Sequence, residues 1–142
     1  MITLSKLKLK FDNKKIPVYC LVNNGYHTFS SILCYEFTDI ISRAAFKSKI
    51  ELLFVSQLNK DTNYFSSIVE STARDLHCFV VQANTSEYGD SRITAPYKTE
   101  KKNILQVKGG ETDVVMISTL KVSELIKSRA QYKRRLVKNI NA

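Results

Sequence analysis

The sequence predicts an α/β fold in which a mixed sheet carries helices on one face. Strand-like and helix-like hydrophobic periods alternate between residues 16 and 83, a pattern typical of α/β proteins. After residue 84 the chain returns to short strand-like runs separated by polar turns. With 142 residues, 44% of them hydrophobic, the chain has the size and apolar content of one domain, and we expect residues 1–142 to form one.

The first two strands are expected to form a hairpin. Residues 16–22 are rich in β-branched and aromatic side chains. They end at Asn23-Asn24-Gly25, a sequence that tolerates the positive φ angles of tight turns. Residues 29–35 are predicted to be the returning strand.

The hydrophobic period changes from that of a strand to that of a helix just after Cys34. The apolar side chains beyond this point follow the spacing of one helical face. They are Phe37, Ile40, Ile41, Ala44 and Ala45. We therefore predict that a strand gives way to a helix next to Cys34.

Two buried strands flank a second predicted helix. Residues 50–56 and 77–83 are short apolar runs, as expected of strands that are covered on both faces. Between them, Asp61 and Thr62 are suited to cap a helix. The predicted buried stripe of this helix consists of Phe65, Ile68, Val69, Thr72 and Leu76.

Three short strands and a closing helix complete the pattern. The strands are predicted at residues 91–95, 103–108 and 113–117, with a turn at residues 108–111. The helix is predicted from Val122, and one of its sides is formed by Val122, Leu125, Ile126 and Arg129. Two helices on one side of the earlier strands leave the other sheet face uncovered, so the chain has the character of half a layered fold.

The net charge of +9 is concentrated at the two ends of the chain. Five lysines against one aspartate give residues 1–15 a charge of +4, and seven basic residues against one glutamate give residues 121–142 a charge of +6. Residues 16–120 are nearly neutral. The basic tail, at about residues 130–142, therefore suits solvent or a weak nucleic-acid contact, and the chain has no basic cleft.

The composition disfavours metal and cofactor chemistry. The three cysteines form no Cys-x-x-Cys pair, His27 and His77 share no metal-ligand spacing, and no glycine-rich phosphate loop is present. We expect no cofactor. No apolar run of about 18 residues and no secretory signal are present, so we expect a cytoplasmic protein that does not enter the membrane.

Cys34 is the strongest candidate for chemistry. A thiol at a strand-to-helix junction lies near the positive end of the helix, which favours the nucleophilic thiolate. The backbone N–H of Tyr35 is then placed to stabilise an oxyanion. On these grounds alone, a small buried hydrophobic side chain is the better explanation of Cys34, and this is also what we expect of Cys20 and Cys78.

Segments around and after Cys34 resemble the nitrilase superfamily of carbon–nitrogen hydrolases. Ile32-Leu-Cys-Tyr-Glu36 is similar to the nucleophile motif of that family. Residues 71–84, Ser-Thr-Ala-Arg-Asp-Leu-His-Cys-Phe-Val-Val-Gln-Ala-Asn, resemble its segment in which an arginine-bearing helix precedes a buried strand.

Two later segments extend this resemblance in the same order. Tyr-Gly-Asp-Ser at residues 88–91, followed by Ala95-Pro96, resembles the family's Gly-x-Ser loop and proline turn. Residues 114–129 resemble its last strand and helix, so that the resemblance covers roughly residues 16–130.

Four shorter stretches, at residues 46–49, 59–65, 74–78 and 108–110, are closer still to the nitrilase-like domains fused behind bacterial defence reverse transcriptases. This narrower resemblance implies that the chain belongs to a larger reverse transcriptase with a role in antiviral defence.

The resemblance implies an α-β-β-α sandwich that hydrolyses amides or nitriles with a Glu, a Lys and a Cys. It places Cys34 as the nucleophile and makes the chain the C-terminal half of such a domain. No Glu precedes Cys34. The general base is therefore expected from an N-terminal half, in the parent polypeptide or in a partner. Because family members form oligomers, we also expect a homo-oligomer.

The other site residues each have two explanations. The stretch Ser-Lys-Leu-Lys-Leu resembles the family's Lys-x-His-Leu sequence and makes Lys6 the candidate catalytic lysine, but a solvated basic strand explains it as well. Glu36 is a candidate for substrate binding because it can hydrogen-bond near the thiolate. Asn59 and Tyr64 are candidates because they follow the C-terminal end of a strand. An acid at a helix start explains Glu36, and ordinary loop polarity explains the other two.

Two classes of function therefore stand side by side. One is a Cys-dependent amidase or nitrilase that is complete only with its N-terminal half. The other is a catalytically inactive nitrilase-fold module used for interaction and assembly, because the base is missing and Lys6 has a second explanation. A weak nucleic-acid contact through the basic tail comes third, since Tyr132 is its only accompanying aromatic residue.

Overall fold

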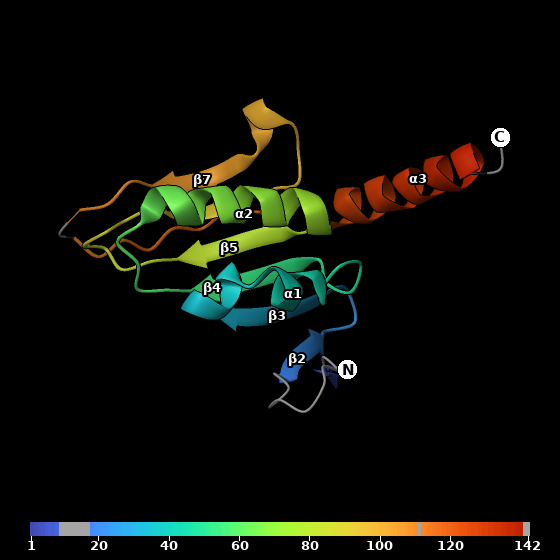
Figure 1. Cartoon of the computed structure of the whole chain (residues 1–142), viewed down its shortest axis with the longest axis horizontal. Coiled ribbons are helices and arrows are strands. Elements are labelled where there is room, and N and C mark those ends of the chain that lie inside the picture. Colours follow the sequence, from blue (N-terminus) through green and yellow to red (C-terminus); the bar gives the residue numbers. More distant parts are fainter. Residues whose placement is uncertain (9–17, 111, 141–142) are drawn as a thin grey trace.

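The computed structural model of the chain describes residues 1–8, 18–110 and 112–140. Its strands form one seven-stranded sheet, in which their spatial order is their order along the chain (Figure 1). They are β1 (Thr3–Lys8), β2 (Val18–Asn23), β3 (Thr28–Leu33), β4 (Leu52–Ser56), β5 (Phe79–Ala83), β6 (Ser91–Thr94) and β7 (Asn103–Val107). The strands β3, β4 and β5 are parallel, and the other neighbouring pairs are antiparallel. The predicted α/β class with a mixed sheet is confirmed.

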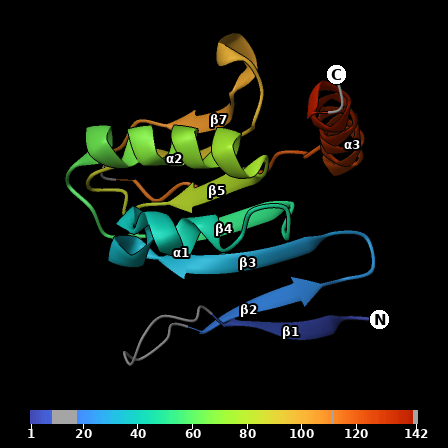
Figure 2. The same cartoon turned by 45° about the vertical axis from the view of Figure 1, so that its right-hand side comes forward.

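The helices are α1 (Ile40–Ala44), α2 (Thr62–Leu76) and α3 (Val122–Ile140), with 3₁₀ turns η1 (Cys34–Thr38) and η2 (Thr99–Lys101). Figure 2 shows that α1 and α2 lie on the same face of the sheet, as predicted. The third helix extends beyond the end of the sheet (Figure 1). No helix in the described part of the chain is long and apolar enough to cross a bilayer.

The hairpin of β2 and β3 is confirmed, and its turn uses the predicted residues. The side chain of Asn23 accepts a hydrogen bond from the Gly25 N–H (2.7 Å), and Gly25 has a φ of 91°. The strand β3 ends at Leu33 and not at Tyr35, because the chain turns sharply at the residue between them. Residues 16 and 17, where the first strand was predicted to begin, lie outside the described residues.

The helix α2 forms as its sequence predicts. The carboxylate of Asp61 accepts a hydrogen bond from the Tyr64 N–H (3.1 Å) and so caps the helix start. The helix ends at His77, which has a left-handed φ of 52°. All residues of the predicted stripe are buried, namely Phe65, Ile68, Val69, Thr72 and Leu76.

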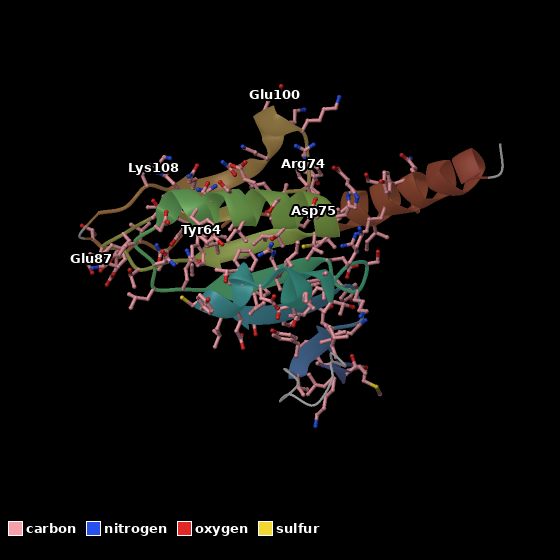
Figure 3. All side chains as sticks on the ribbon, viewed as in Figure 1. Tyr64, Arg74, Asp75, Glu87, Glu100 and Lys108 are labelled. Atoms are coloured by element: carbon pink, nitrogen blue, oxygen red, sulfur yellow. The ribbon has the colours of Figure 1, made fainter. Side chains whose placement is uncertain are left out.

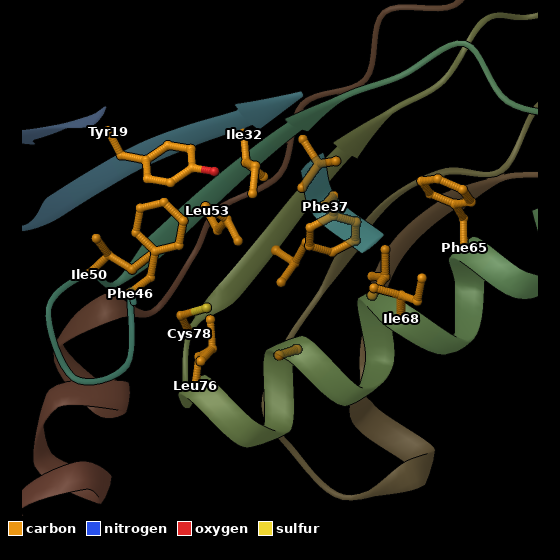
Figure 4. Close-up of a cluster of buried hydrophobic side chains, with 14 residues drawn as sticks. Tyr19, Ile32, Phe37, Phe46, Ile50, Leu53, Phe65, Ile68, Leu76 and Cys78 are labelled. Atoms are coloured by element: carbon orange, nitrogen blue, oxygen red, sulfur yellow. The ribbon is translucent and has the colours of Figure 1, made fainter. Parts of the chain in front are cut away.

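The face that carries α1 and α2 holds the main hydrophobic core (Figure 4). Alternate residues of the parallel strands point toward this face, and the register sets Ile32 beside Val55 and Leu53 beside Val80. The other members of the core are Tyr19, Phe37, Phe46, Ile50, Phe65, Ile68, Val69, Ala73, Leu76 and Cys78.

The opposite face is covered at one end of the strands. Leu52, Phe79 and Leu125 of α3 belong to one cluster and are 7%, 0% and 2% exposed. At this end α3 supplies the layer that shields the sheet from water.

Further along the strands, the same face is left open. Phe54, Val81, Ile93 and Leu105 lie side by side across β4, β5, β6 and β7. This far-face row is only partly covered: Phe54 is 38% exposed, and the other three are half-buried. An apolar row of this kind is a surface suited to another layer of protein.

The helical region after Cys34 differs from the prediction in its phase. The turn η1 starts at Cys34 itself, and α1 starts anew after Asp39, whose carboxylate accepts a hydrogen bond from the Ser42 N–H (2.8 Å). This cap shifts the helical phase, so that Ile40 is 69% exposed while Phe46 is fully buried. The predicted apolar face was Phe37, Ile40, Ile41, Ala44 and Ala45, of which only Phe37 is buried.

The strands predicted at residues 91–95 and 103–108 are confirmed as β6 and β7, but the strand predicted at residues 113–117 is wrong. That segment joins no strand in the described part of the chain, and Val115 and Ile117 are each 92% exposed. A strand forms only against a neighbour that takes up its backbone hydrogen bonds, and no described strand pairs with this segment. Glu111, in the preceding turn, lies outside the described residues.

Arg129 fastens α3 to the beginnings of β4 and β5. Its guanidinium donates hydrogen bonds to the carbonyls of His77 (2.7 Å) and Ile50 and to the carboxylate of Glu51 (2.7 Å). Glu51 also accepts a hydrogen bond from the Thr28 N–H (2.7 Å). The side chains of Arg129 and Glu51 are 14% and 15% exposed, so their interaction is largely shielded from water.

Replacing this anchor is expected to destabilise the fold. Arg129→Met should lower the free energy of unfolding by about 2–3 kcal/mol, because it leaves Glu51 and two carbonyls without their donor. Urea denaturation followed by circular dichroism measures this loss. The exposed Lys127 on the same helix offers the control, since Lys127→Met should change stability by no more than about 0.5 kcal/mol. Equal effects of the two substitutions would contradict the anchoring role.

Candidate active site around Cys34

Cys34 lies at the point where β3 turns into η1. Its φ is 30°, a left-handed value that is uncommon for any residue other than glycine. Strained backbone of this kind clusters at active sites, because the surrounding structure must hold it in place. The half-buried thiol lies at the carboxyl ends of three parallel strands, the edge where α/β proteins gather their sites. The predicted strand-to-helix junction at Cys34 is thus present.

The sulfur faces the loop that follows β4. Its nearest hydrogen-bond acceptor is the backbone carbonyl oxygen of Leu58, 4.0 Å from Sγ. Residues 57–60 of this loop run between β4 and α2. The Gln57 N–H continues the β4–β5 ladder by donating to the carbonyl of Ala83 (2.9 Å). The position of the loop therefore sets what the thiol meets on this side.

Asn84, directly after β5, holds the same loop with its side chain. Its Oδ1 accepts a hydrogen bond from the Asn59 N–H (2.9 Å), and its Nδ2 donates to the carbonyl of Asn59 (2.9 Å). The same Nδ2 also donates to the carbonyl of Gly89 (2.8 Å). One side-chain amide thus ties the loop after β4 to the loop after β5.

A cavity of about 340 Å³ opens at the same edge of the sheet. Asn84, Ser91 and Val107 lie on one part of its wall, and residues 112–114 lie on another. Neighbouring strands are about 4.8 Å apart, so the ends of β3 and β5, and with them Cys34 and Asn84, are separated by roughly 10 Å. Asn84 is therefore the residue of this cavity wall that follows a parallel strand, two strands away from the strand that leads to Cys34.

Close backbone packing shapes the loops around this cavity. Gly89 has a φ of 70°, and a Cβ added to it would lie 2.0 Å from the carbonyl oxygen of Lys108. The Asp90 N–H donates to the carbonyl of Val107 (2.8 Å), and the Gly110 N–H donates to that of Ser86 (3.2 Å). Only glycine fits the approach at position 89.

Glu36 and Tyr35 lie on the same turn as Cys34. The carboxylate of Glu36 accepts a hydrogen bond from the Leu33 N–H (3.3 Å), so it closes the turn in which the thiol sits. The side chain of Tyr35 is 84% exposed. Its backbone N–H lies in the first turn of η1, where N–H groups have no acceptor within the helix. This placement suits the predicted oxyanion donor.

Asn59 and Tyr64 occupy the loop and helix beside the site. Asn59 uses its backbone on Asn84 and its side-chain Oδ1 to accept from the Asp61 N–H (2.7 Å). Tyr64 projects from the first turn of α2 and is 52% exposed (Figure 3). Asn59 thus stabilises the conformation of its own loop. The ring of Tyr64 makes an edge-to-face contact with the ring of Phe65.

Lys6 lies on the edge strand β1, opposite Cys20 of β2. Because β2 separates β1 from β3, Lys6 is two strand spacings, or roughly 10 Å, from the strand that leads to Cys34. Its side chain is exposed. The chain alone does not bring Lys6 to the thiol, and the solvated-strand explanation fits its placement.

The carboxylates nearest to Cys34 in the sequence are already engaged. Glu36 closes η1, and Asp39 binds the backbone and hydroxyl of Ser42 (2.8 and 2.6 Å). The pKa of Asp39 is lowered, chiefly by the hydrogen bond from the Ser42 hydroxyl. In the described residues, no group of three or more His, Cys, Asp or Glu side chains is placed to hold a metal ion.

Sequence reasoning missed the residues that hold the site together. Asn84 is the last residue of the family-like segment at 71–84, and its sequence context predicts no contact with the loop after β4. The contact of the Leu58 carbonyl uses a backbone atom, which no residue type predicts. Asn84 and Asn59 are 25 residues apart, so no local pattern connects them. An asparagine directly after a buried strand was the one signal available.

Known structures resemble this fold, although no protein-family model and no curated protein matches the sequence. XC1258 from Xanthomonas campestris, a CN-hydrolase superfamily protein, aligns with a TM-score of 0.64 and 12% identity over 93% of this chain and 49% of that chain. This chain has part of the CN-hydrolase fold. It spans about half the length of XC1258.

Two structures of an amidase from Nesterenkonia sp. AN1 also align. A cysteine-to-alanine variant, described as belonging to the nitrilase superfamily, has a TM-score of 0.56 at 13% identity over 96% of this chain and 68% of that chain. A second variant, with acrylamide added at its active site cysteine, has a TM-score of 0.54 at 14% identity over 96% and 69%. This chain thus shares its fold with part of an amidase that has an active site cysteine.

The three cysteines differ sharply in their surroundings. All three are free, Cys20 is exposed on β2, and Cys78 is fully buried in the main core. Burial raises the pKa of the Cys78 thiol to about 12. The small-hydrophobe explanation therefore fits Cys78, but it does not fit Cys20.

This difference predicts a labelling pattern in the folded chain. Iodoacetamide at pH 8 should alkylate Cys34 and Cys20 and leave Cys78 unmodified, because Cys78 has neither access nor a thiolate. Peptide mass spectrometry measures each site separately. All three should react in 8 M urea, on the order of the concentration that unfolds most domains. Alkylation of native Cys78 at the rate of Cys20 would show that the core is not packed as described.

Proposed function

We propose that the chain is the cysteine-bearing half of a carbon–nitrogen hydrolase that acts on amides or nitriles. The observation that carries the proposal is the placement of Cys34, a half-buried thiol on a positive-φ turn at the carboxyl edge of three parallel strands. Sharp strand-to-helix turns present nucleophiles in other hydrolases in the same manner. The fold shared with XC1258 and the Nesterenkonia amidase supports this function.

The proposed chemistry follows from the groups at this turn. The Cys34 thiolate attacks the carbonyl carbon of an amide, and the oxygen that becomes negative faces the Tyr35 N–H. The C–N bond then breaks, and the nitrogen leaves as ammonia or an amine after it takes up a proton. Water attacks the remaining thioester, which releases a carboxylic acid and restores the thiol.

The proton transfers need a base that this chain does not place beside Cys34. Glu36 and Asp39 are engaged in closing their turns, and Lys6 lies on the edge strand. We propose that the N-terminal half of the domain, in the parent polypeptide or in a partner, supplies a glutamate to the thiol and either brings Lys6 closer or supplies its own lysine.

The far-face row supports the proposal of a missing half. Its residues, Phe54, Val81, Ile93 and Leu105, form an apolar band across four strands that the described chain covers only in part. Sheets that pack face to face bury such bands between them. A second sheet on this face would shield the row and would cover the edge at which Cys34 and the cavity open.

The segment at residues 113–117 supports the same proposal. Its alternating and consecutive apolar residues predict a strand, yet Val115 and Ile117 are exposed to solvent. A strand from the missing half would pair with it and bury these side chains. Oligomers of the completed domain remain part of the proposal.

Loss of the nucleophile provides the direct test. In the polypeptide that carries the N-terminal half, Cys34→Ser should reduce amide or nitrile hydrolysis by at least about a thousandfold, because the reaction passes through its thioester. Ammonia release from a panel of simple amides and nitriles measures the rate. Cys20→Ser, at an exposed position on β2, is the control and should retain full activity. Hydrolysis that survives Cys34→Ser would overturn the proposal.

The second candidate is a nitrilase-fold module that binds partners without catalysis. The engaged carboxylates of Glu36 and Asp39 favour it, since neither is free to act as the base. A completed protein that hydrolyses nothing in the panel, with or without Cys34, would establish this alternative. A glutamate within about 4 Å of the Cys34 sulfur, close enough for charge coupling, would count against it.

We further propose that the parent protein is a bacterial defence reverse transcriptase in the cytoplasm, on the resemblance of the four short stretches named above. Three free cysteines suit a reducing compartment. The helix α3 carries the basic tail, in which residues 130–142 contain four Lys and Arg and no acid. A weak contact with nucleic acid through this tail fits that setting.

A salt titration tests the contribution of the basic tail. Removing residues 130–142 should abolish weak binding to single-stranded and duplex nucleic acid, because those phosphate contacts account for the dependence of affinity on salt. The double substitution Arg134→Gln and Arg135→Gln should reduce the slope of log affinity against log salt by about two. Binding that keeps the same slope after the truncation would place the contact elsewhere on the protein.

A further inference from the structure

Asn84 lines the cavity, and its side chain holds the loop that the sulfur faces. Its side-chain amide pairs with both backbone groups of Asn59 at 2.9 Å each. Leu58, the preceding residue, presents its carbonyl oxygen to the Cys34 sulfur at 4.0 Å. The Asn84 amide therefore determines where the Leu58 carbonyl oxygen lies relative to the Cys34 sulfur.

The backbone of Asn84 is itself fixed by Ser91. The Asn84 N–H donates to the Ser91 hydroxyl (3.0 Å), and this hydroxyl donates to the Asn84 carbonyl (3.1 Å). The side-chain amide then bridges from this fixed point to Asn59 on one side and to Gly89 on the other (2.8 Å). Ser91 thus supports the junction without touching the loop that faces the sulfur.

We propose that Asn84 is a positioning residue for Cys34, and that it acts by clamping residues 57–60 so that the Leu58 carbonyl holds the thiol in one orientation. The inference rests on the proposed function. It goes beyond that function because it names the residue that sets how the sulfur is presented. The clamp also fixes one wall of the approach to the thiol, next to the cavity that Asn84 lines.

The clamp makes a specific prediction about reactivity. While the Leu58 carbonyl faces the sulfur, it accepts the thiol proton and holds the sulfur in one orientation, and the fixed loop restricts access. Freeing the loop removes both effects together. Asn84→Ala should therefore raise the rate of Cys34 alkylation by iodoacetamide relative to that of Cys20, by at least about threefold between pH 7 and pH 9.

Two further variants separate positioning from plain stability. Asn84→Asp keeps the Oδ1 acceptor for the Asn59 N–H and loses both Nδ2 donations, so its Cys34/Cys20 rate ratio should lie between those of the natural chain and Asn84→Ala. Asn103→Ala is the matched control, because it also removes a side-chain amide that makes two hydrogen bonds, on β7 and outside this junction. Its rate ratio should stay within about 1.5-fold of that of the natural chain.

Cys78 reports within the same experiment whether each variant is folded. If Cys78 of Asn84→Ala reacts, that variant has unfolded, and Asn84→Asp decides the question. An unchanged Cys34/Cys20 ratio in the folded Asn84 variants would overturn the proposal, as would an equal rise in Asn103→Ala. The measurement needs no substrate turnover, so it is independent of whether the completed protein hydrolyses amides.

Discussion

The parallel pairing of β3 with β4 and β5 is the constraint on which the site depends. It brings three strand ends to one edge of the sheet, and each end continues into a residue of the site. Cys34 follows β3, the Leu58 carbonyl follows β4, and Asn84 follows β5. The main core under α1 and α2 locks this register, because a slip by one residue would turn the buried alternate side chains toward the opposite face.

The two faces of the sheet explain why this half-site is stable and yet incomplete. One face is sealed by α2 and α1, and the anchor of Arg129 on Glu51 brings α3 over one end of the other face. The far-face row and the segment at residues 113–117 remain open on that other face. The chain therefore folds around its own core, and the layer that we propose to complete its chemistry would pack on this open part of the other face.

Local patterns predicted much of this fold. The cap at Asp61, the buried stripe of α2 and the turn at Gly25 arise from contacts over a few residues, and all three are found.

The apolar face of α1 was mispredicted because the cap at Asp39 restarts the helix in a new phase. The strand at residues 113–117 failed for a different reason, since its period is that of a strand but no strand in the described part of the chain pairs with it. The position of Cys34 was predictable from the change of period, whereas the clamp of Asn84 on Asn59 depends on the register of two strands. The distance of Lys6 from the thiol likewise follows from the order of β1, β2 and β3.

We propose that the N-terminal half of the domain completes both the sheet sandwich and the chemistry of Cys34. An experimental structure of the polypeptide that carries the N-terminal half tests it most directly, through the distance from the Cys34 Sγ to the nearest glutamate carboxylate oxygen. The account predicts a distance within about 4 Å, together with a second sheet over Phe54, Val81, Ile93 and Leu105. A far-face row open to solvent, with no carboxylate near the sulfur, would contradict it.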